Sequence, residues 1–274
     1  MTKVLIDADE LIYKACAAAE YDLEMGGNHV LMSDFGTTQR IFCDQEAKIC
    51  DSLGATEVYM ALSDTKNFRK DILPTYKSNR KNSRKPLAFP RLRQWVEDSY
   101  HTLQRPALEA DDLLGIFHQD YDYIAASDKD LLTIPTRVYS LMKDKVTEVS
   151  PAQANYNWLL QTLVGDRVDG YAGCPGMGPV KAKAFLDRAG SIPGEISGGE
   201  LPETWAAIVE AFEDKEMTAE EYRRVCIAEL GDFIGEVIAG IYEGIRAGSM
   251  DNLSQFSHVA EREHQRWEDF FGRM

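Results

Sequence analysis

Short apolar runs alternate along this chain with longer segments in which apolar residues return every three or four positions. The short runs predict buried strands, and the longer segments predict amphipathic helices. Strands are expected at 4–6, 57–63, 123–126 and 138–142, and helices at 11–20, 38–53, 87–95, 109–117 and 152–164. Elements that alternate in this way predict an α/β fold with a mostly parallel central sheet flanked by helices.

Three of the predicted strands are followed by an aspartate, namely Asp7, Asp64 and Asp128. A single aspartate at a strand end usually starts a turn or caps a helix. Parallel strands, however, end at the same edge of a sheet, which is where ligands bind in open α/β folds. The recurrence therefore predicts one site to which all three carboxylates contribute.

More acids surround the third of these strands. Glu109, Asp111 and Asp112 fall in the first turn of the predicted helix 109–117, and Asp130 follows Asp128 closely. Acids in a first turn can simply complement the helix dipole. So many like charges repel one another, however, and divalent cations with a preference for hard oxygen ligands would relieve that repulsion. Asp166 and Asp169, near the end of helix 152–164, would add two further ligands.

The overall charge of the chain argues against a nucleic-acid partner, but its distribution does not. The 274 residues are 44% hydrophobic, enough for a substantial core, and carry a formal net charge of -15. One segment, Lys66–Arg93, holds ten Lys or Arg residues and a single acid, which leaves 20 basic and 44 acidic residues elsewhere. This basic tract is a candidate phosphate-binding segment, and a solvated surface loop is the alternative.

Within the basic tract, the stretch 77–86 has almost no apolar residues. We expect it to be mobile on its own and to become ordered when a polyanion binds. Tyr76 and Phe89 lie on either side of this stretch, and each would stack on bases or anchor the loop in the core.

A second candidate phosphate-binding feature is the turn Gly176-Met-Gly178. It leads into a helix that Pro179 begins and Gly190 ends. A glycine turn before a helix offers backbone N–H groups to a phosphate, and the neighbouring Lys181 and Lys183 strengthen that interpretation.

The cysteines and the hydropathy bear on the compartment. The five cysteines are scattered without a CxxC pair, which suits reduced thiols in a cytosol, and Cys174 is expected to be a packed thiol. The first apolar run is only three residues long, and no stretch approaches the length of a membrane span. We therefore expect a cytoplasmic protein, with its five histidines in structural or surface roles.

Taken together, the motifs resemble those of the 5′-nuclease (flap endonuclease) superfamily, and most of all those of short bacteriophage 5′→3′ exonucleases. The resemblance covers roughly Lys3–Gly190. The motifs that carry it are Asp7, Ala61-Leu-Ser-Asp64, Phe68-Arg69, Tyr76-Lys77-Ser-Asn-Arg80, Glu109-Ala-Asp-Asp112, Ser127-Asp-Lys-Asp130, Gly165-Asp-Arg-Val-Asp-Gly170 and Gly176-Met-Gly178.

The resemblance implies two divalent metals, Mg²⁺ or Mn²⁺, that cleave a phosphodiester with water as nucleophile. Ligands of the first metal would be Asp7, Asp64, Glu109, Asp111 and Asp112. Ligands of the second, or residues supporting it, would be Asp128, Asp130, Asp166 and Asp169.

The resemblance also implies a helical arch in which Lys77 and Arg80 reach the scissile phosphate as catalytic residues. A C-terminal helix–hairpin–helix at Gly176–Gly178 would grip the duplex backbone beside one K⁺. The expected DNA-binding residues are Arg69, Tyr76, Lys77, Arg80, Lys81, Arg84, Lys85, Gly176, Gly178, Lys181 and Lys183.

The expected partner is DNA with a 5′ end, whether duplex, overhang or flap, or an RNA–DNA hybrid, bound by a monomer without a membrane. The location is the cytoplasm of a bacterial or phage-infected cell. The predicted organisation is a nuclease core at 1–150 with a basic arch at about 66–93, a helix–hairpin–helix region at 151–190 and a helical segment at 191–274.

Two other classes of protein compete with this interpretation. Asp7-Ala-Asp9 after a strand also fits a haloacid dehalogenase-type phosphatase with Asp7 as a covalent nucleophile, although that leaves the basic tract and the glycine turn unexplained. A DNA-binding module without catalysis is the other alternative, but all nine acids are present.

Overall fold

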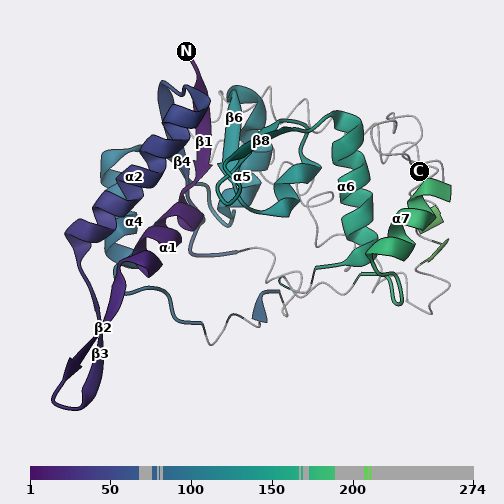
Figure 1. Ribbon diagram of the computed structural model, residues 1–274. Coiled ribbons are helices and arrows are strands. Elements are labelled where there is room, and N and C mark those ends of the chain that lie inside the picture. The colour runs from purple at the N-terminus through teal and green to yellow at the C-terminus, as the bar shows by residue number, and fades with distance from the viewer. Residues whose placement is uncertain are drawn as a thin grey trace, which may run out of the picture. The chain divides into compact units, whose positions relative to one another are not determined.

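The computed structural model describes residues 1–67, 76–78, 80, 83–166, 168, 173–188, 207–208 and 210–211 (Figure 1). The chain divides into two compact units. The first contains Met1–Phe68 and Arg80–Val149, and the second contains Arg69–Asn79 and Ser150–Met274. Residues 68–75, 79, 81 and 82 of the basic tract and most of the segment 191–274 lie outside the described residues. The expected ordering of stretch 77–86 on DNA stays a prediction.

A six-stranded sheet forms the centre of the first unit, with the order β5-β4-β1-β6-β7-β8. Neighbouring strands are parallel except for β7 and β8, which are antiparallel. The mostly parallel sheet is therefore confirmed. Its strands are β1 (Lys3–Asp7), β4 (Glu57–Ala61), β5 (His101–Leu103), β6 (Tyr123–Ala126), β7 (Arg137–Ser140) and β8 (Lys145–Glu148).

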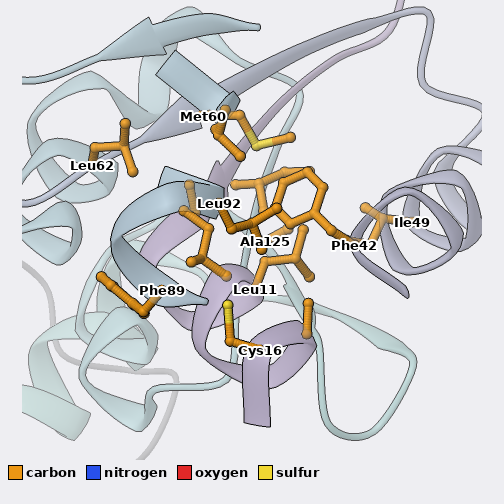
Figure 2. Packing of buried hydrophobic residues seen from close by; sticks show 14 of the residues in the cluster. Leu11, Cys16, Phe42, Ile49, Met60, Leu62, Phe89, Leu92 and Ala125 are labelled. Atoms are coloured by element: carbon orange, nitrogen blue, oxygen red, sulfur yellow. The ribbon is translucent and has the colours of Figure 1, made fainter. Parts of the chain in front are cut away.

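Three helices cover one face of this sheet: α1 (Ala8–Ala18), α2 (Phe35–Leu53) and α4 (Phe89–Ser99). Val4 and Ile6, on alternate positions of β1, pack into the cluster that these helices form. Figure 2 shows Leu11, Phe42 and Leu92 meeting side chains of the sheet in that cluster. Helix α5 (Ala110–Phe117) contacts β1 and β4 through residues outside the cluster.

Helices α1 and α2 each begin three residues earlier than the sequence predicted. The helix predicted at 11–20 begins at Ala8, because Asp7 caps it directly and accepts a hydrogen bond from Glu10 N. The helix predicted at 38–53 begins at Phe35, since Asp34 accepts from Thr37 N. Its predicted end at Gly54 is confirmed, with that glycine in the left-handed region at φ 60°.

A β-hairpin between α1 and α2 was not expected. It consists of β2 (Glu20–Met25) and β3 (Asn28–Ser33), joined at Gly26 and Gly27, whose φ values are 60° and 83°. Glycine adopts positive φ values without strain, which allows two of them in succession at this turn. One face of the hairpin is apolar and exposed, carrying Tyr21, Leu23, Met25, Val30 and Met32.

Two helices organise the described part of the second unit: α6 (Pro151–Val164) and α7 (Pro179–Arg188). The predicted start of α6 is confirmed, because Ser150 Oγ accepts from Gln153 N and Pro151 takes the first position. Gly173, at φ 66°, lies against the C-terminal end of α6. A Cβ atom on this residue would be 2.5 Å from Gly165 N. Cys174 is buried between the helices, as expected for a packed thiol. Gly190, the predicted end of α7, is outside the described residues.

The described helices include none that is both long enough and apolar enough to cross a membrane.

Candidate active site

The three strand-end aspartates lie at one edge of the sheet. Strands β4, β1 and β6 are adjacent and parallel. Asp7 is the last residue of β1, Asp64 follows the end of β4 by three residues, and Asp128 follows the end of β6 by two. The three aspartates therefore lie at the carboxyl-end edge of the parallel strands, as the sequence predicted.

Asp7 is the most buried of the three. It is only 9% exposed, and its Oδ1 atom accepts a hydrogen bond of 3.0 Å from Glu10 N. Burial raises the pKa of the Asp7 carboxyl from 3.8 to about 7, and the nearby charges of Asp9 and Glu10 add to that rise. A carboxylate held in this way gains most from a cation beside it.

Asp64 joins the loop after β4 to the segment before α5. Its Oδ2 atom accepts from Ala107 N at 2.8 Å, and its Oδ1 atom accepts from Thr65 N at 2.7 Å. The backbone N–H of Ala107 holds the pKa of the Asp64 carboxyl below its usual value, and that of Thr65 lowers it further. Asp64 N in turn donates to Leu108 O at 2.8 Å. Asp64 is thus fixed from two directions.

The acids at the start of α5 have unequal surroundings. Glu109 is the N-cap, and Asp112, which is fully buried, accepts from Glu109 N at 2.8 Å in a capping box. Asp111 is half-buried in the same turn. The capping role is therefore real for Glu109 and Asp112, and it does not prevent their remaining lone pairs from binding a cation.

Asp128 is exposed and caps the short helix η3 (Lys129–Thr133), accepting from Asp130 N at 3.0 Å. In the second unit, Asp166 is buried and its Oδ1 atom accepts from Val168 N at 2.6 Å. Asp169 lies outside the described residues. The two acids expected near the end of α6 thus belong to a different unit from the strand-end acids.

Within the described ranges, no three His, Cys, Asp or Glu side chains are grouped closely enough to hold a metal ion. Backbone N–H groups instead solvate several of the predicted ligands, as they do for Asp7, Asp64, Asp112, Asp128 and Asp166. Because like charges repel, we expect carboxylates to stand apart until a cation draws them together. The edge brings together the elements that carry the acids of the first unit, while those acids themselves remain separate.

A network that the sequence did not reveal connects these elements. Asp9, in the first turn of α1, accepts from Ser63 N and from Arg93 Nη1, both at 2.8 Å. Glu10 accepts from Ser127 N at 2.7 Å and pairs with Lys14. The N-terminus of α1 is thereby tied to the loops that follow β4 and β6. The only signal in the sequence was the pair of acids two and three residues after Asp7.

The basic tract holds several of the expected DNA-binding residues. Tyr76 is buried, with Lys77 Nζ 4.8 Å from the centre of its ring. Phe89 is buried too, and Lys85 Nζ lies 4.4 Å from its ring centre. Burial of both aromatic residues favours anchoring over base stacking. Arg80 is exposed, and Arg69 and Lys81 are outside the described residues.

Arg84 is engaged within the protein. Its two terminal nitrogens donate to the two carboxylate oxygens of Glu20 at 2.8 and 2.7 Å. The hydrogen bonds from Arg84 lower the pKa of Glu20 to about 2. An Arg84 that contacted a phosphate would have to exchange this pair for the new one.

The glycine turn before α7 contains a residue in the left-handed region of backbone conformation. Gly176 has a φ of 80°, and Ala182 N donates to Gly178 O in the first bond of the helix. Lys183 is exposed, while Lys181 Nζ donates to Gly176 O at 3.3 Å. Both lysines therefore lie on the helix that the turn begins.

Two bacteriophage nucleases are similar to this chain in sequence. An exodeoxyribonuclease of Enterobacteria phage T3 is 29% identical over 67% of this chain, and an exonuclease of Escherichia phage T7 is 28% identical over 68% of it. Each alignment spans 66% of the relative's own length, so this chain matches just under two-thirds of these proteins.

Solved structures share the fold. A flap endonuclease of bacteriophage T5, solved as a pseudo-enzyme–product complex with DNA and metal ions, aligns over 98% of each chain with a TM-score of 0.56. Another phage T5 structure, co-crystallised with metal ions, has a TM-score of 0.53 over 98% of this chain and 99% of the other. Sequence identities of 13% and 14% restrict this likeness to the fold.

Residues 2–158 match the protein family described as 5′-3′ exonuclease, N-terminal resolvase-like domain. This span covers more than half of the chain and includes seven of the nine predicted metal ligands, from Asp7 to Asp130. The chain therefore belongs to the 5′-3′ exonuclease family, of which it carries the N-terminal resolvase-like domain.

Proposed function

We propose that this chain is a metal-dependent 5′→3′ exonuclease and flap endonuclease that hydrolyses phosphodiester bonds near the 5′ ends of duplex or branched DNA. The observation that carries the proposal is the position of Asp7, Asp64 and Asp128 after three adjacent parallel strands of a family domain. The phage T3 and T7 relatives are named as exonucleases, and the phage T5 flap endonuclease was solved with DNA and metal ions. These names support DNA as the substrate.

The acids fit divalent metals chemically. They offer hard anionic oxygens of the kind that Mg²⁺ and Mn²⁺ prefer. The raised pKa of the buried Asp7 supports a site in which a cation stabilises the charged form. The proposed ligands of one ion are Asp7, Asp64, Glu109, Asp111 and Asp112. The proposed ligands of the other are Asp128, Asp130, Asp166 and Asp169.

Two such ions, when bound, would make a water molecule a better nucleophile and offset the charge that develops on the phosphate. The chain's own part is to hold its carboxylates at fixed positions and leave room for the phosphate. Asp7 and Asp112 are buried and act as helix caps, so their carboxyl groups are oriented by α1 and α5. This arrangement needs no histidine as a base, and His118 is buried with its Nδ1 atom 2.7 Å from Gly115 O.

The remaining proposed contacts are with the nucleic-acid backbone. Lys77 and Arg80 would stabilise charge at the scissile phosphate, and the exposed Lys85 would lie along the strand. Gly176, Gly178, Lys181 and Lys183 would hold the duplex backbone, with one K⁺ at the turn. The proposed organisation remains a nuclease core at 1–150, a DNA-gripping region at 151–190 and a helical segment at 191–274, acting as a monomer.

A duplex with a 5′ overhang and a labelled 5′-phosphate tests the proposal. In Mg²⁺ we expect labelled mono- or oligonucleotides to appear, and in EDTA none. Release of labelled inorganic phosphate alone, with an acid-labile phosphoryl-enzyme, would support the phosphatase alternative instead. The family match favours the nuclease over that alternative. Binding of the duplex without any product in Mg²⁺ would support the non-catalytic module.

Replacing Lys181 and Lys183 together by alanine is expected to weaken duplex binding at low salt and leave turnover at saturating DNA unchanged. Each phosphate contact that is lost should reduce the slope of log affinity against log salt concentration by up to about one unit. Binding titrations in EDTA at several salt concentrations measure this slope. A large fall in turnover with unchanged affinity would assign these lysines to the chemistry.

A further inference from the structure

Arg93 makes an unusually complete set of contacts for a residue at the end of a basic tract. Its side chain is 19% exposed and donates from all three of its nitrogens. Nη1 donates to Asp9 Oδ1 at 2.8 Å, Nη2 to Ser63 O at 2.8 Å and Nε to Glu97 Oε1 at 3.0 Å. A guanidinium used so fully holds parts of the protein together.

Asp9 completes a closed arrangement around Ser63. Its Oδ2 atom accepts from Ser63 N at 2.8 Å, while Arg93 donates to the carbonyl oxygen of the same residue. Ser63 is therefore held by both of its backbone polar groups, one by α1 and the other by α4. The Asp9–Arg93 ion pair joins these two helices, and both side chains are largely shielded from solvent.

The held residue touches every element that carries a proposed ligand of the first metal. Ser63 directly precedes Asp64, and its Oγ atom accepts from Ala110 N, at the start of α5, at 2.9 Å. Ala110 is followed by Asp111 and Asp112, and Asp9 lies two residues after Asp7. One cluster thus fixes β1–α1, the loop after β4 and the start of α5 relative to one another.

We propose that Asp9 and Arg93 are positioning residues for the metal site, which set its affinity without contacting the metal. This inference rests on the proposed function. The carboxylates of Asp7, Asp64 and Asp111 repel one another without a cation. If the loops and helix starts that carry them were free to shift, the carboxylates would move further apart. The cluster restrains that separation and reduces the rearrangement that metal binding requires. Groups that orient metal ligands typically change affinity by about 10- to 100-fold when they are removed.

Mn²⁺ alone is the probe, with its dissociation constant measured on the folded protein by titration of the free-ion EPR signal. Arg93→Met and Asp9→Asn are each expected to weaken Mn²⁺ binding by about 10-fold or more. The double variant should be no weaker than the worse single variant, because both changes break the same pair. DNA binding in EDTA should stay as in wild type.

Glu97→Gln is the matched control. It removes a partner of the same guanidinium, but that partner lies on Arg93's own helix and not at the strand edge. Its Mn²⁺ affinity is expected within about two-fold of wild type, because this i,i+4 pair lies within α4 and does not tie it to Ser63 or α1. A merely structural role for Arg93 would lower the melting temperature and leave the Mn²⁺ affinity of the folded protein unchanged.

Wild-type affinity in folded Arg93→Met and Asp9→Asn would overturn the inference while leaving the proposed function in place. If Arg93→Met does not fold, Asp9→Asn decides alone, because asparagine is isosteric and its amide oxygen still accepts from Ser63 N. Absence of Mn²⁺ binding by the wild type would instead overturn the proposed metal site and this inference with it.

Discussion

Asp7→Asn is expected to abolish Mg²⁺-dependent cleavage and, at the same time, to make the metal-free protein more stable above pH 7. Asparagine keeps the cap on α1, because it is as good an N-cap as aspartate. It removes a charge whose burial raises the pKa to about 7. Loss of a metal ligand should lower the cleavage rate by orders of magnitude.

The stability effect has a definite pH dependence. Because the Asp7 pKa is higher in the folded state, its contribution to stability is fully present below about pH 4 and is lost as the pH rises through 7. At 1.36 kcal/mol per pKa unit, a rise of about three units corresponds to at most about 4 kcal/mol. Thermal unfolding in EDTA should therefore separate the wild type from Asp7→Asn little at pH 4, more at pH 5 and most at pH 8.

Asp34→Asn provides the control, since Asp34 caps α2 in the same way but is exposed. The hydrogen bonds from Thr37 lower the pKa of Asp34, so any effect of this change on stability should have the opposite sign at pH 8. Its cleavage rate should equal that of the wild type. An Asp7→Asn protein that still cleaves DNA in Mg²⁺, or that is less stable than wild type at pH 8 in EDTA, would contradict the account.

Asp111→Asn should reduce cleavage by orders of magnitude while DNA binding in EDTA stays the same or becomes tighter. The first effect follows from removing a metal ligand, and the second from removing a negative charge that faces an anionic substrate. Asp111 is a better probe than Asp112, whose buried carboxylate also caps α5. If Asp111 served only the helix dipole, its loss would cost roughly 1 kcal/mol of stability and leave activity near normal.

Asp120→Asn is the matched control for this change, because Asp120 is an exposed acid just beyond the other end of α5. It should alter neither cleavage in Mg²⁺ nor binding in EDTA. Weaker binding of DNA by a folded Asp111→Asn protein in EDTA would refute the repulsion argument, and retained cleavage would refute the metal assignment.

The sequence predicted those parts of the fold that depend on burial. The runs that form β1, β4 and β6 are buried in the sheet and therefore apolar, so both the strands and the acids that follow them could be recognised. Strands β5 and β8 are short and mostly exposed, and they carry no such signal. The β2–β3 hairpin did carry a sequence signal. Its Gly26-Gly27 turn stands between two runs in which apolar and polar residues alternate.

The candidate site divides in the same way. The common edge of Asp7, Asp64 and Asp128 follows from parallel strands, and the sequence was sufficient to predict it. The contact between Asp9 and Arg93 joins residues 84 positions apart and depends on how α4 packs against α1, which no local pattern encodes. Nor could the sequence predict that the carboxylates stand apart, with backbone N–H groups bound to Asp7, Asp64, Asp112, Asp128 and Asp166.

The number of Mn²⁺ ions that the wild-type chain binds, compared with Asp111→Asn, tests the central claim most directly. Counting bound ions by EPR at saturating Mn²⁺ should give two per wild-type chain, magnetically coupled because two-metal sites hold their ions about 4 Å apart. Asp111→Asn should bind at least one fewer and show no coupling. A wild-type chain that binds no Mn²⁺ while it still releases nucleotides from a 5′ end would contradict the account.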